Sequence, residues 1–252
     1  MRLIVDSGST KTDWICIDDK GEILFDTQTK GLNPQVLTEQ IIEERVINNF
    51  DLYQNRKKIS HLYFYGAGCG TESPRKLIKK VFERVFVKSL IDIKEDTYAA
   101  VFATCDLGQK SITSILGTGS NCTYFDGKNI LQKVDSLGYV IMDDASGNYF
   151  GRQLIRDYYF DKMPLSVQKK ISESFDMQSN TIKDHIYKRP NPNTYLAKFG
   201  RFVIDNKELP YFKKLIKKGF NLFILNQIEQ FSDCREIPLH FIGSIGFYLK
   251  DE

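Results

Sequence analysis

The segment Asp6-Ser7-Gly8-Ser9-Thr10-Lys11-Thr12-Asp13 lies between the apolar runs Leu3-Ile4-Val5 and Trp14-Ile15-Cys16-Ile17. Two β-rich runs joined by small hydroxyl residues and one glycine predict a hairpin whose turn leaves backbone N–H groups free. Such a turn can bind phosphate, while the acid at the end of the first strand holds Mg²⁺. An ordinary hydroxyl-rich turn is the structural alternative. The candidate residues are Asp6 for the metal and Gly8, Ser9, Thr10 and Lys11 for phosphate.

A second turn of the same kind follows roughly a hundred residues later, in Ser114-Ile115-Leu116-Gly117-Thr118-Gly119-Ser120-Asn121-Cys122-Thr123-Tyr124-Phe125. It again predicts a strand, a turn of small residues and a strand. Two such hairpins indicate a duplicated α/β unit with one glycine loop in each half, both facing a shared cleft.

Four motifs in order, DSGSTKTDW, GLNP, ILGTGSNC and GYVIMDDASG, resemble those of the N-acetylglucosamine kinase and BadF/BadG/BcrA/BcrD ATPase family. The resemblance spans nearly the whole chain. It implies an α/β, duplicated actin-like ATPase (ribonuclease H-like) fold, with two lobes, a mixed sheet of about five strands in each, and a cleft between them. We expect the N-terminal lobe over residues 1–107 and the C-terminal lobe over residues 108–252, the latter shorter than in relatives.

The resemblance implies ATP-dependent phosphorylation of an amino sugar, most directly N-acetylglucosamine, with N-acetylmuramate or glucosamine next. ATP and Mg²⁺ are the implied cofactors. The general base of the family precedes the GTGSN loop by about twenty residues, and Asp96 lies 21 residues before Gly117. The other implied residues are Asn33, Ser120, Asn121 and Asp143 for the sugar, Gly117, Thr118 and Gly119 for phosphate, and Gly243 and Ser244 for the adenosine motif.

Two of these residues have structural interpretations that stay open. An acid between a strand and a helix is often a helix N-cap, which is compatible with catalysis because the helix N-terminus keeps a carboxylate ionised. Asn33 in Asn-Pro is typical of a helix cap or breaker. A well-oriented carboxylate of ordinary pKa, near ~4, suffices for Asp96 because phosphoryl transfer asks little of the base.

The loop Met142-Asp143-Asp144-Ala145-Ser146 departs from the family pattern Gly-Asp-Glu-Gly-Ser and keeps only the first acid and the serine. In the phosphate loop we expect Gly119 to have a positive φ, which would exclude a Cβ.

A glycine loop between a strand and a helix, Gly66-Ala67-Gly68-Cys69-Gly70-Thr71, is where a dinucleotide fingerprint would lie. Thr71 occupies the place of the third glycine, and no suitable acid follows about twenty residues later. The chain also has no Walker A pattern. We therefore interpret these glycines as allowing close approach of the chain to the cleft.

The hydrophobic pattern predicts further elements. We expect a third meander strand at 21–27, one helix at 37–50, a strand at 86–93, a third strand of the second meander at 129–134, mostly helix at 165–231 and a buried strand from residue 239.

Composition excludes several classes of protein. The 252 residues are 42% hydrophobic and carry 35 basic and 32 acidic side chains, too balanced for a nucleic-acid partner. With no apolar run near 18 residues and no leader pattern, we expect a cytoplasmic protein without a membrane partner. Five scattered cysteines indicate neither a disulfide framework nor a zinc site. The expected partners are the amino sugar and ATP, and a homodimer is left open.

Two rival functions remain on the sequence. An activator ATPase of the dehydratase or reductase type would share the fold but needs exposed cysteines for an iron–sulfur cluster, and glycine-flanked Cys69 alone looks exposed. A non-catalytic sugar-sensing protein would fit the altered 142–146 loop.

Overall fold

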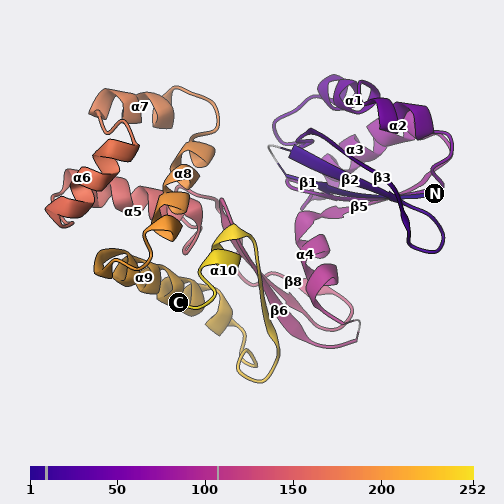
Figure 1. Cartoon of the computed structure of the whole chain (residues 1–252). Helices are drawn as coiled ribbons and strands as arrows, with labels where there is room; N and C mark the ends of the chain where they lie inside the picture. Colours follow the sequence, from indigo (N-terminus) through magenta and orange to yellow (C-terminus); the bar gives the residue numbers. More distant parts are fainter. Residues whose placement is uncertain (9–10, 107) are drawn as a thin grey trace. The chain divides into compact units, whose positions relative to one another are not determined.

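The chain forms two compact units in a computed structural model that describes residues 1–8, 11–106 and 108–252. The first unit comprises Met1–Ala103 and the second Thr104–Glu252. Each has its own mixed β-sheet and its own hydrophobic core (Figure 1). The predicted α/β class with two mixed sheets is confirmed.

The first unit is built on a five-stranded sheet in the order β3-β2-β1-β4-β5. β1, β2 and β3 form the predicted antiparallel meander, while β4 and β5 run parallel to β1. The carboxyl ends of the three parallel strands therefore lie at one edge. The strands are β1 (Arg2–Ser7), β2 (Lys11–Ile17), β3 (Ile23–Lys30), β4 (His61–Gly66) and β5 (Leu90–Glu95).

An aromatic cluster joins the sheet to helix α3 (Glu72–Val85). Alternate strand residues such as Val5 and Phe64 are fully buried, as expected where one sheet face carries a helix. The Phe64 and Phe82 rings meet edge to face with centroids 5.2 Å apart, and Trp14 lies 6.0 Å from Phe82. The core of this unit thus lies between the sheet and α3.

The helix predicted at 37–50 is wrong in extent, because two helices occupy this region: α1 (Glu39–Ile47) and α2 (Phe50–Asn55). Asn49 separates them, since its side chain accepts a hydrogen bond from the Leu52 N–H and caps α2. The strand predicted from Phe86 starts later, at Leu90, because Phe86 ends α3 as its buried C-cap.

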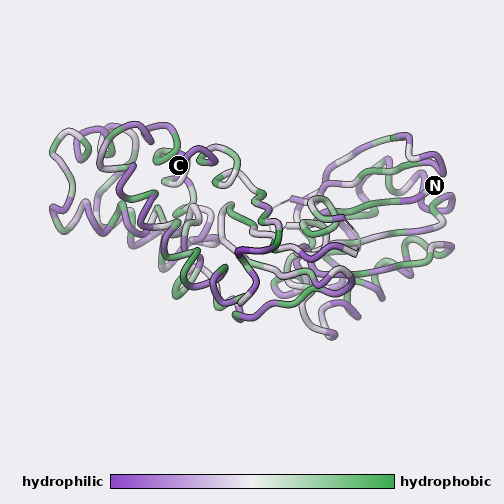
Figure 2. Tube along the Cα trace, turned by 90° about the horizontal axis from the view of Figure 1, so that it is seen from below, coloured by the Kyte–Doolittle hydropathy of each residue, from purple (hydrophilic) through white to green (hydrophobic). Residues whose placement is uncertain are grey.

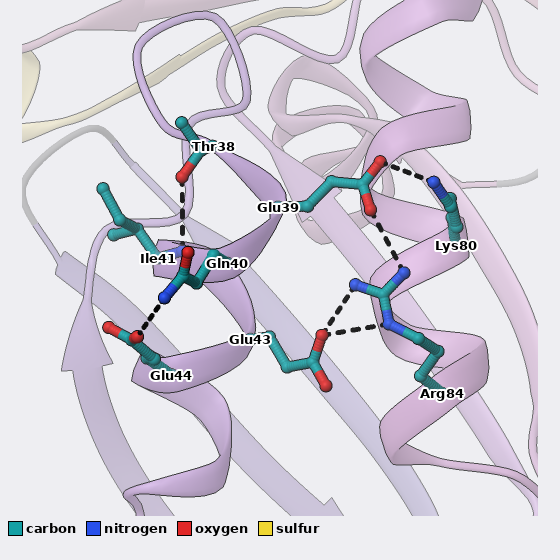
Figure 3. A network of polar contacts seen from close by, with 8 residues as sticks. All are labelled: Thr38, Glu39, Gln40, Ile41, Glu43, Glu44, Lys80 and Arg84. Atoms are coloured by element: carbon teal, nitrogen blue, oxygen red, sulfur yellow. Dashed lines mark hydrogen bonds and ion pairs between the residues drawn. The ribbon is translucent and has the colours of Figure 1, made fainter.

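An exposed ion-pair network ties α1 to α3 (Figure 3). Arg84 bonds to Glu43 at 2.6 Å and to Glu39 at 3.1 Å, and Lys80 bonds to Glu39 at 2.9 Å. Such solvated pairs add little stability individually, but the forked guanidinium fixes how α1 lies along α3.

The second unit has a four-stranded sheet in the order β8-β7-β6-β9, rather than about five strands. The strands are β6 (Ser111–Leu116), β7 (Ser120–Phe125), β8 (Ile130–Leu131) and β9 (Leu239–Ile242). β8 ends earlier than the predicted strand at 129–134, because its pairing with β7 stops at Leu131 and the backbone bends at residues 133–134. β9 was expected to be buried, but Leu239 and Phe241 are 41% and 46% exposed at this edge of the sheet.

Helices form most of the second unit, as predicted, and their turns alternate between hydrophilic and hydrophobic residues (Figure 2). α4 (Asp96–Thr104) belongs to the first unit except for its last residue. The helices of the second unit are α5 (Gly147–Tyr159), α6 (Leu165–Ser174), α7 (Ser179–Tyr187), α8 (Pro192–Asp205), α9 (Pro210–Asn226), the 3-10 turn η1 (Ile228–Gln230) and α10 (Ser244–Tyr248). α5 and α8 pack closely because Gly151 has no side chain. A Cβ at this position would lie 2.2 Å from the Leu196 carbonyl oxygen. In the described part of the chain, no helix combines the length and apolarity needed to cross a membrane.

Candidate functional site

The carboxyl edge of the first sheet brings two candidate acids together. Asp6 lies near the end of β1, and Asp96 begins α4 directly after β5. The strand register aligns Ser7 with Gly66 and Gly66 with Glu95, so these strand ends are neighbours. The edge at which parallel strands end is where open α/β sheets bind ligands.

The Asp96 carboxylate is partly buried and accepts hydrogen bonds from the backbone N–H groups of Thr97 and of Asp96 itself. Burial, and then the charges of Glu95 and Asp6, raise its pKa from 3.8 to about 6. The expected ordinary pKa near ~4 is therefore wrong. The backbone N–H groups at the start of α4 lower this pKa, but burial and the neighbouring charges outweigh them, and the raised pKa suits proton transfer near neutral pH.

Asp6 is solvent accessible, although the surrounding protein still desolvates its carboxylate. This desolvation and the charge of Asp13 raise its pKa, while Lys11 lowers it. Lys11 is paired with Asp13 at 2.9 Å and so does not neutralise Asp6 by direct contact in this geometry. A carboxylate with this excess negative charge fits a divalent cation.

The predicted phosphate turn is closed by a hydrogen bond from the Gly8 N–H to the Lys11 carbonyl oxygen, at 3.0 Å. Gly8 and Lys11 therefore flank the turn as expected. Ser9 and Thr10, the other two predicted phosphate ligands, lie outside the described residues.

Asn33 is held in a loop next to the glycine loop. Its side-chain oxygen accepts the Gln35 N–H at 2.9 Å, and a Cβ on Gly68, which has φ +81°, would lie 2.3 Å from that oxygen. Asn33 does not cap α1, because Thr38 does so through a bond from the Ile41 N–H. The cap interpretation of Asn33 is thus wrong.

The glycine loop 66–70 lies between Asn33 and the acids, which explains its composition. A Cβ on Gly70 would lie 3.2 Å from the Glu95 carboxylate, so both Gly68 and Gly70 allow the close approach that we expected. Cys69 is fully buried and its pKa is raised to about 12 by burial. Its expected exposure is wrong, which removes the feature that favoured an iron–sulfur activator.

In the second unit, the turn between β6 and β7 rests on the start of α5. The Gly147 N–H donates to the Gly117 carbonyl oxygen at 2.8 Å, and the Asn148 N–H donates to the Thr118 carbonyl oxygen at 3.0 Å. Gly119 does not have the expected positive φ. The glycine is needed for a different reason, since a Cβ there would lie 2.7 Å from the Asp143 carboxylate.

Asp143 is 9% exposed and has a left-handed backbone, with φ 63°. Its carboxylate accepts bonds from the Ser120 N–H and the Asn148 side chain, which lower its pKa, but burial is larger and raises it. Ala145, where the resembling family has glycine, is also left-handed, at φ 58°. This conformation costs an alanine about 1–2 kcal/mol, so the 142–146 loop keeps its shape at the expense of strain.

A cavity of about 110 Å³ joins the second predicted phosphate loop to the predicted adenosine motif. A Cβ on Gly243 would lie 2.4 Å from the Leu116 carbonyl oxygen, so the motif requires its glycine at φ +95°. A larger apolar cavity of about 330 Å³ between α9, β9 and α10 contains none of the predicted site residues. The smaller cavity is lined by Gly117, Thr118, Gly147, Ala197, Arg201, Ile204, Ser244, Ile245 and Tyr248.

Asn121 is a further sugar candidate. Its side-chain oxygen already accepts a hydrogen bond from the Thr123 hydroxyl at 2.9 Å. Sequence reasoning assigned no role to Glu95 or Asn148, which contact the predicted site. Two consecutive acids at a strand end were the available signal for Glu95. No comparable signal marks Asn148.

Comparisons with known proteins identify relatives of this fold. No family model matches the chain, and no curated protein matches it. Among solved structures, the "putative N-acetylglucosamine kinase" of Porphyromonas gingivalis is 33% identical, with a TM-score of 0.90 over 100% of this chain and 88% of that one. A protein of the same description from Chromobacterium violaceum is 16% identical, with a TM-score of 0.69 over 100% and 90% of the two chains, and shares the fold. The chain therefore belongs to the N-acetylglucosamine kinase family of actin-like ATPase proteins.

Proposed function

We propose that the chain is an ATP-dependent kinase of an amino sugar, with N-acetylglucosamine as the first candidate and N-acetylmuramate or glucosamine next. The observation that carries this proposal is the carboxyl edge of the first sheet. There a partly buried Asp96 with a pKa of about 6 lies within electrostatic reach of Asp6. The full-length similarity to the Porphyromonas gingivalis protein supports the same activity.

Asp96 is the proposed general base. As the sugar hydroxyl oxygen bonds to the γ-phosphorus of ATP, the bond from that phosphorus to the β-γ bridging oxygen breaks and ADP leaves. The hydroxyl proton passes to the Asp96 carboxylate. At neutral pH a carboxylate with a pKa of about 6 is mostly ionised, so it is ready to accept that proton.

Each unit holds side chains that are proposed for sugar binding. Asn33 is preorganised by the Gln35 N–H and by Gly68. Asp143 is held by the Ser120 N–H and Asn148. In this proposal Ser120 and Asn121 complete the sugar contacts. Fixed polar side chains of this kind orient the reacting hydroxyl and lower the entropic cost of reaction.

Each unit contributes residues that are proposed to bind phosphate. They are Gly8, Ser9, Thr10 and Lys11 in the first unit and Gly117, Thr118 and Gly119 in the second. Asp6 would hold Mg²⁺, which when bound neutralises charge on the phosphate oxygens. Gly243 and Ser244 would bind adenosine, because Ser244 shares the 110 Å³ cavity with Gly117 and Thr118.

The test is ADP release with Mg-ATP over a panel of N-acetylglucosamine, N-acetylmuramate, glucosamine and glucose. We expect the highest kcat/KM with an amino sugar and a phosphorylated product detected by mass spectrometry. Sugar binding by calorimetry without any ADP release would instead indicate the non-catalytic sugar sensor.

A further inference from the structure

We propose that the buried hydroxyls of Ser7 and Thr12 form a clamp that positions the Asn33 loop for sugar binding. Both side chains are 0% exposed, and neither has a role in the mechanism above. They are direct partners across the β1–β2 hairpin, with their oxygens 2.8 Å apart. The inference rests on the proposed function, because it concerns the sugar contact assigned to Asn33.

The backbone groups at the two ends of the clamp determine which hydroxyl donates in each hydrogen bond. The Leu32 N–H donates to the Ser7 oxygen at 3.1 Å, and Thr12 donates to the Lys30 carbonyl oxygen at 3.3 Å. Since Thr12 has one hydroxyl proton and uses it there, Ser7 must donate to Thr12. The series of hydrogen bonds therefore runs from the Leu32 N–H through the Ser7 and Thr12 hydroxyls to the Lys30 carbonyl oxygen.

This chain of bonds begins and ends on the segment that leads into the sugar loop. Lys30 ends β3, and Leu32 directly precedes Asn33. Arg45 bonds to the carbonyl oxygen of Gly31, between the two clamped residues. The Lys30 and Gly31 carbonyl groups and the Leu32 N–H are thus all hydrogen-bonded, which fixes the position of the backbone just before Asn33.

Ser7 also connects to the glycine loop through its backbone. The Ala67 N–H donates to the Ser7 carbonyl oxygen at 2.8 Å, and the next residue, Gly68, is the one that lies against Asn33. Ser7 therefore contacts both segments that bracket Asn33. Buried chains of hydrogen bonds polarise one another and favour one arrangement, as a positioning role requires.

The clamp is separate from the phosphate side of the hairpin. Side chains alternate across a strand, so Asp6, Lys11 and Asp13 lie on the face opposite to Ser7 and Thr12. The backbone pairing between β1 and β2 does not depend on the two hydroxyls. Removing a hydroxyl should consequently affect the sugar loop more than ATP binding.

The experiment compares Ser7→Ala and Thr12→Val with Ser89→Ala. Ser89 donates to the Ile59 carbonyl oxygen at 2.7 Å beside the amino end of β5, so its variant removes one hydroxyl bond away from the clamp. We expect the sugar KM to rise about 3- to 10-fold in the two clamp variants, the effect of one weakened hydrogen bond. The ATP KM should stay within about twofold, and Ser89→Ala should leave both constants unchanged.

Hydrogen exchange of the protein without ligands supplies an independent readout. Amides of residues 30–36 should exchange faster in both clamp variants than in the parent or Ser89→Ala. Ser7→Ala removes the acceptor of the Leu32 N–H, and Thr12→Val removes the donor to the Lys30 carbonyl oxygen. If these amides exchange at the parental rate in both clamp variants, the clamp is contradicted, and this holds even if the protein phosphorylates no sugar. A parental sugar KM, or equal rises in the KM of sugar and ATP, overturns the positioning role in an active enzyme. If the parent itself uses no amino sugar, the proposed function fails instead.

Discussion

Replacing Asp96 by asparagine should stabilise the first unit at pH 8 while removing the proposed base. The Asp96 pKa is raised from 3.8 to about 6 by burial and by two neighbouring carboxylates, so the ionised form is disfavoured in the folded protein. A raised carboxyl pKa gives stability that is fully present below about pH 4 and is lost as pH rises through about 6. Asparagine stays neutral at every pH, so the variant does not lose this part of its folding stability as pH rises.

The size of the effect follows from the difference between the two pKa values. Each unit corresponds to about 1.4 kcal/mol, so ionised Asp96 costs the folded state up to about 3 kcal/mol at pH 8. At pH 5 the cost is about half as large, and it vanishes below about pH 4. The asparagine side-chain oxygen can still accept the backbone N–H bonds at the start of α4.

The assay is urea denaturation of parent and variant at pH 8 and pH 5, followed by tryptophan fluorescence. Trp14 is the single tryptophan and is fully buried in the first unit, so its signal reports on this unit. Asp92→Asn, at an exposed acid on β5, is the matched control and should change stability little at either pH. The raised pKa of Asp96 would be contradicted if Asp96→Asn were no more stable than the parent at pH 8, or if its gain in unfolding free energy were the same at pH 5 and pH 8.

Three further outcomes are expected. Asp6→Asn should weaken Mg²⁺-dependent turnover far more than sugar binding measured by calorimetry, and equal losses in both would contradict its metal role. Gly119→Ala should raise the sugar KM because its Cβ would lie 2.7 Å from the Asp143 carboxylate, whereas Gly117→Ala, with nothing within 4 Å, should not; similar KM values in the two variants would count against this contact. Arg84→Ala should lower the urea midpoint slightly, less so at high salt, and leave turnover unchanged, and a salt-independent loss would mean that packing rather than charge is responsible.

Local sequence patterns predicted the parts of the fold that local chemistry determines. The apolar runs Leu3-Ile4-Val5 and Trp14-Ile15-Cys16-Ile17, joined by a turn of small residues, were sufficient to predict the first hairpin. The break at Asn49 was missed because periodic apolar residues continue through it, while the capping bond to Leu52 is visible only in the structure.

The site could be predicted only as a set of residue types. Burial of Cys69 and the close approach of Gly119 to Asp143 depend on segments far apart in sequence. The raised Asp96 pKa likewise depends first on burial and then on the charges of Glu95 and Asp6, and Asp6 comes near Asp96 only through the parallel order of the strands. A pattern of residues cannot show such distances, because side-chain burial and charge coupling follow from tertiary packing.

The most direct test of the central claim is steady-state ADP release by the parent and Asp96→Asn with Mg-ATP and N-acetylglucosamine, beside calorimetric sugar binding. We predict sugar-dependent ADP release by the parent and a fall of about 10²–10⁴-fold in the variant, the range that general-base catalysis contributes. Sugar affinity should change far less, since an amide still hydrogen-bonds a hydroxyl. Parental turnover in Asp96→Asn would contradict the account.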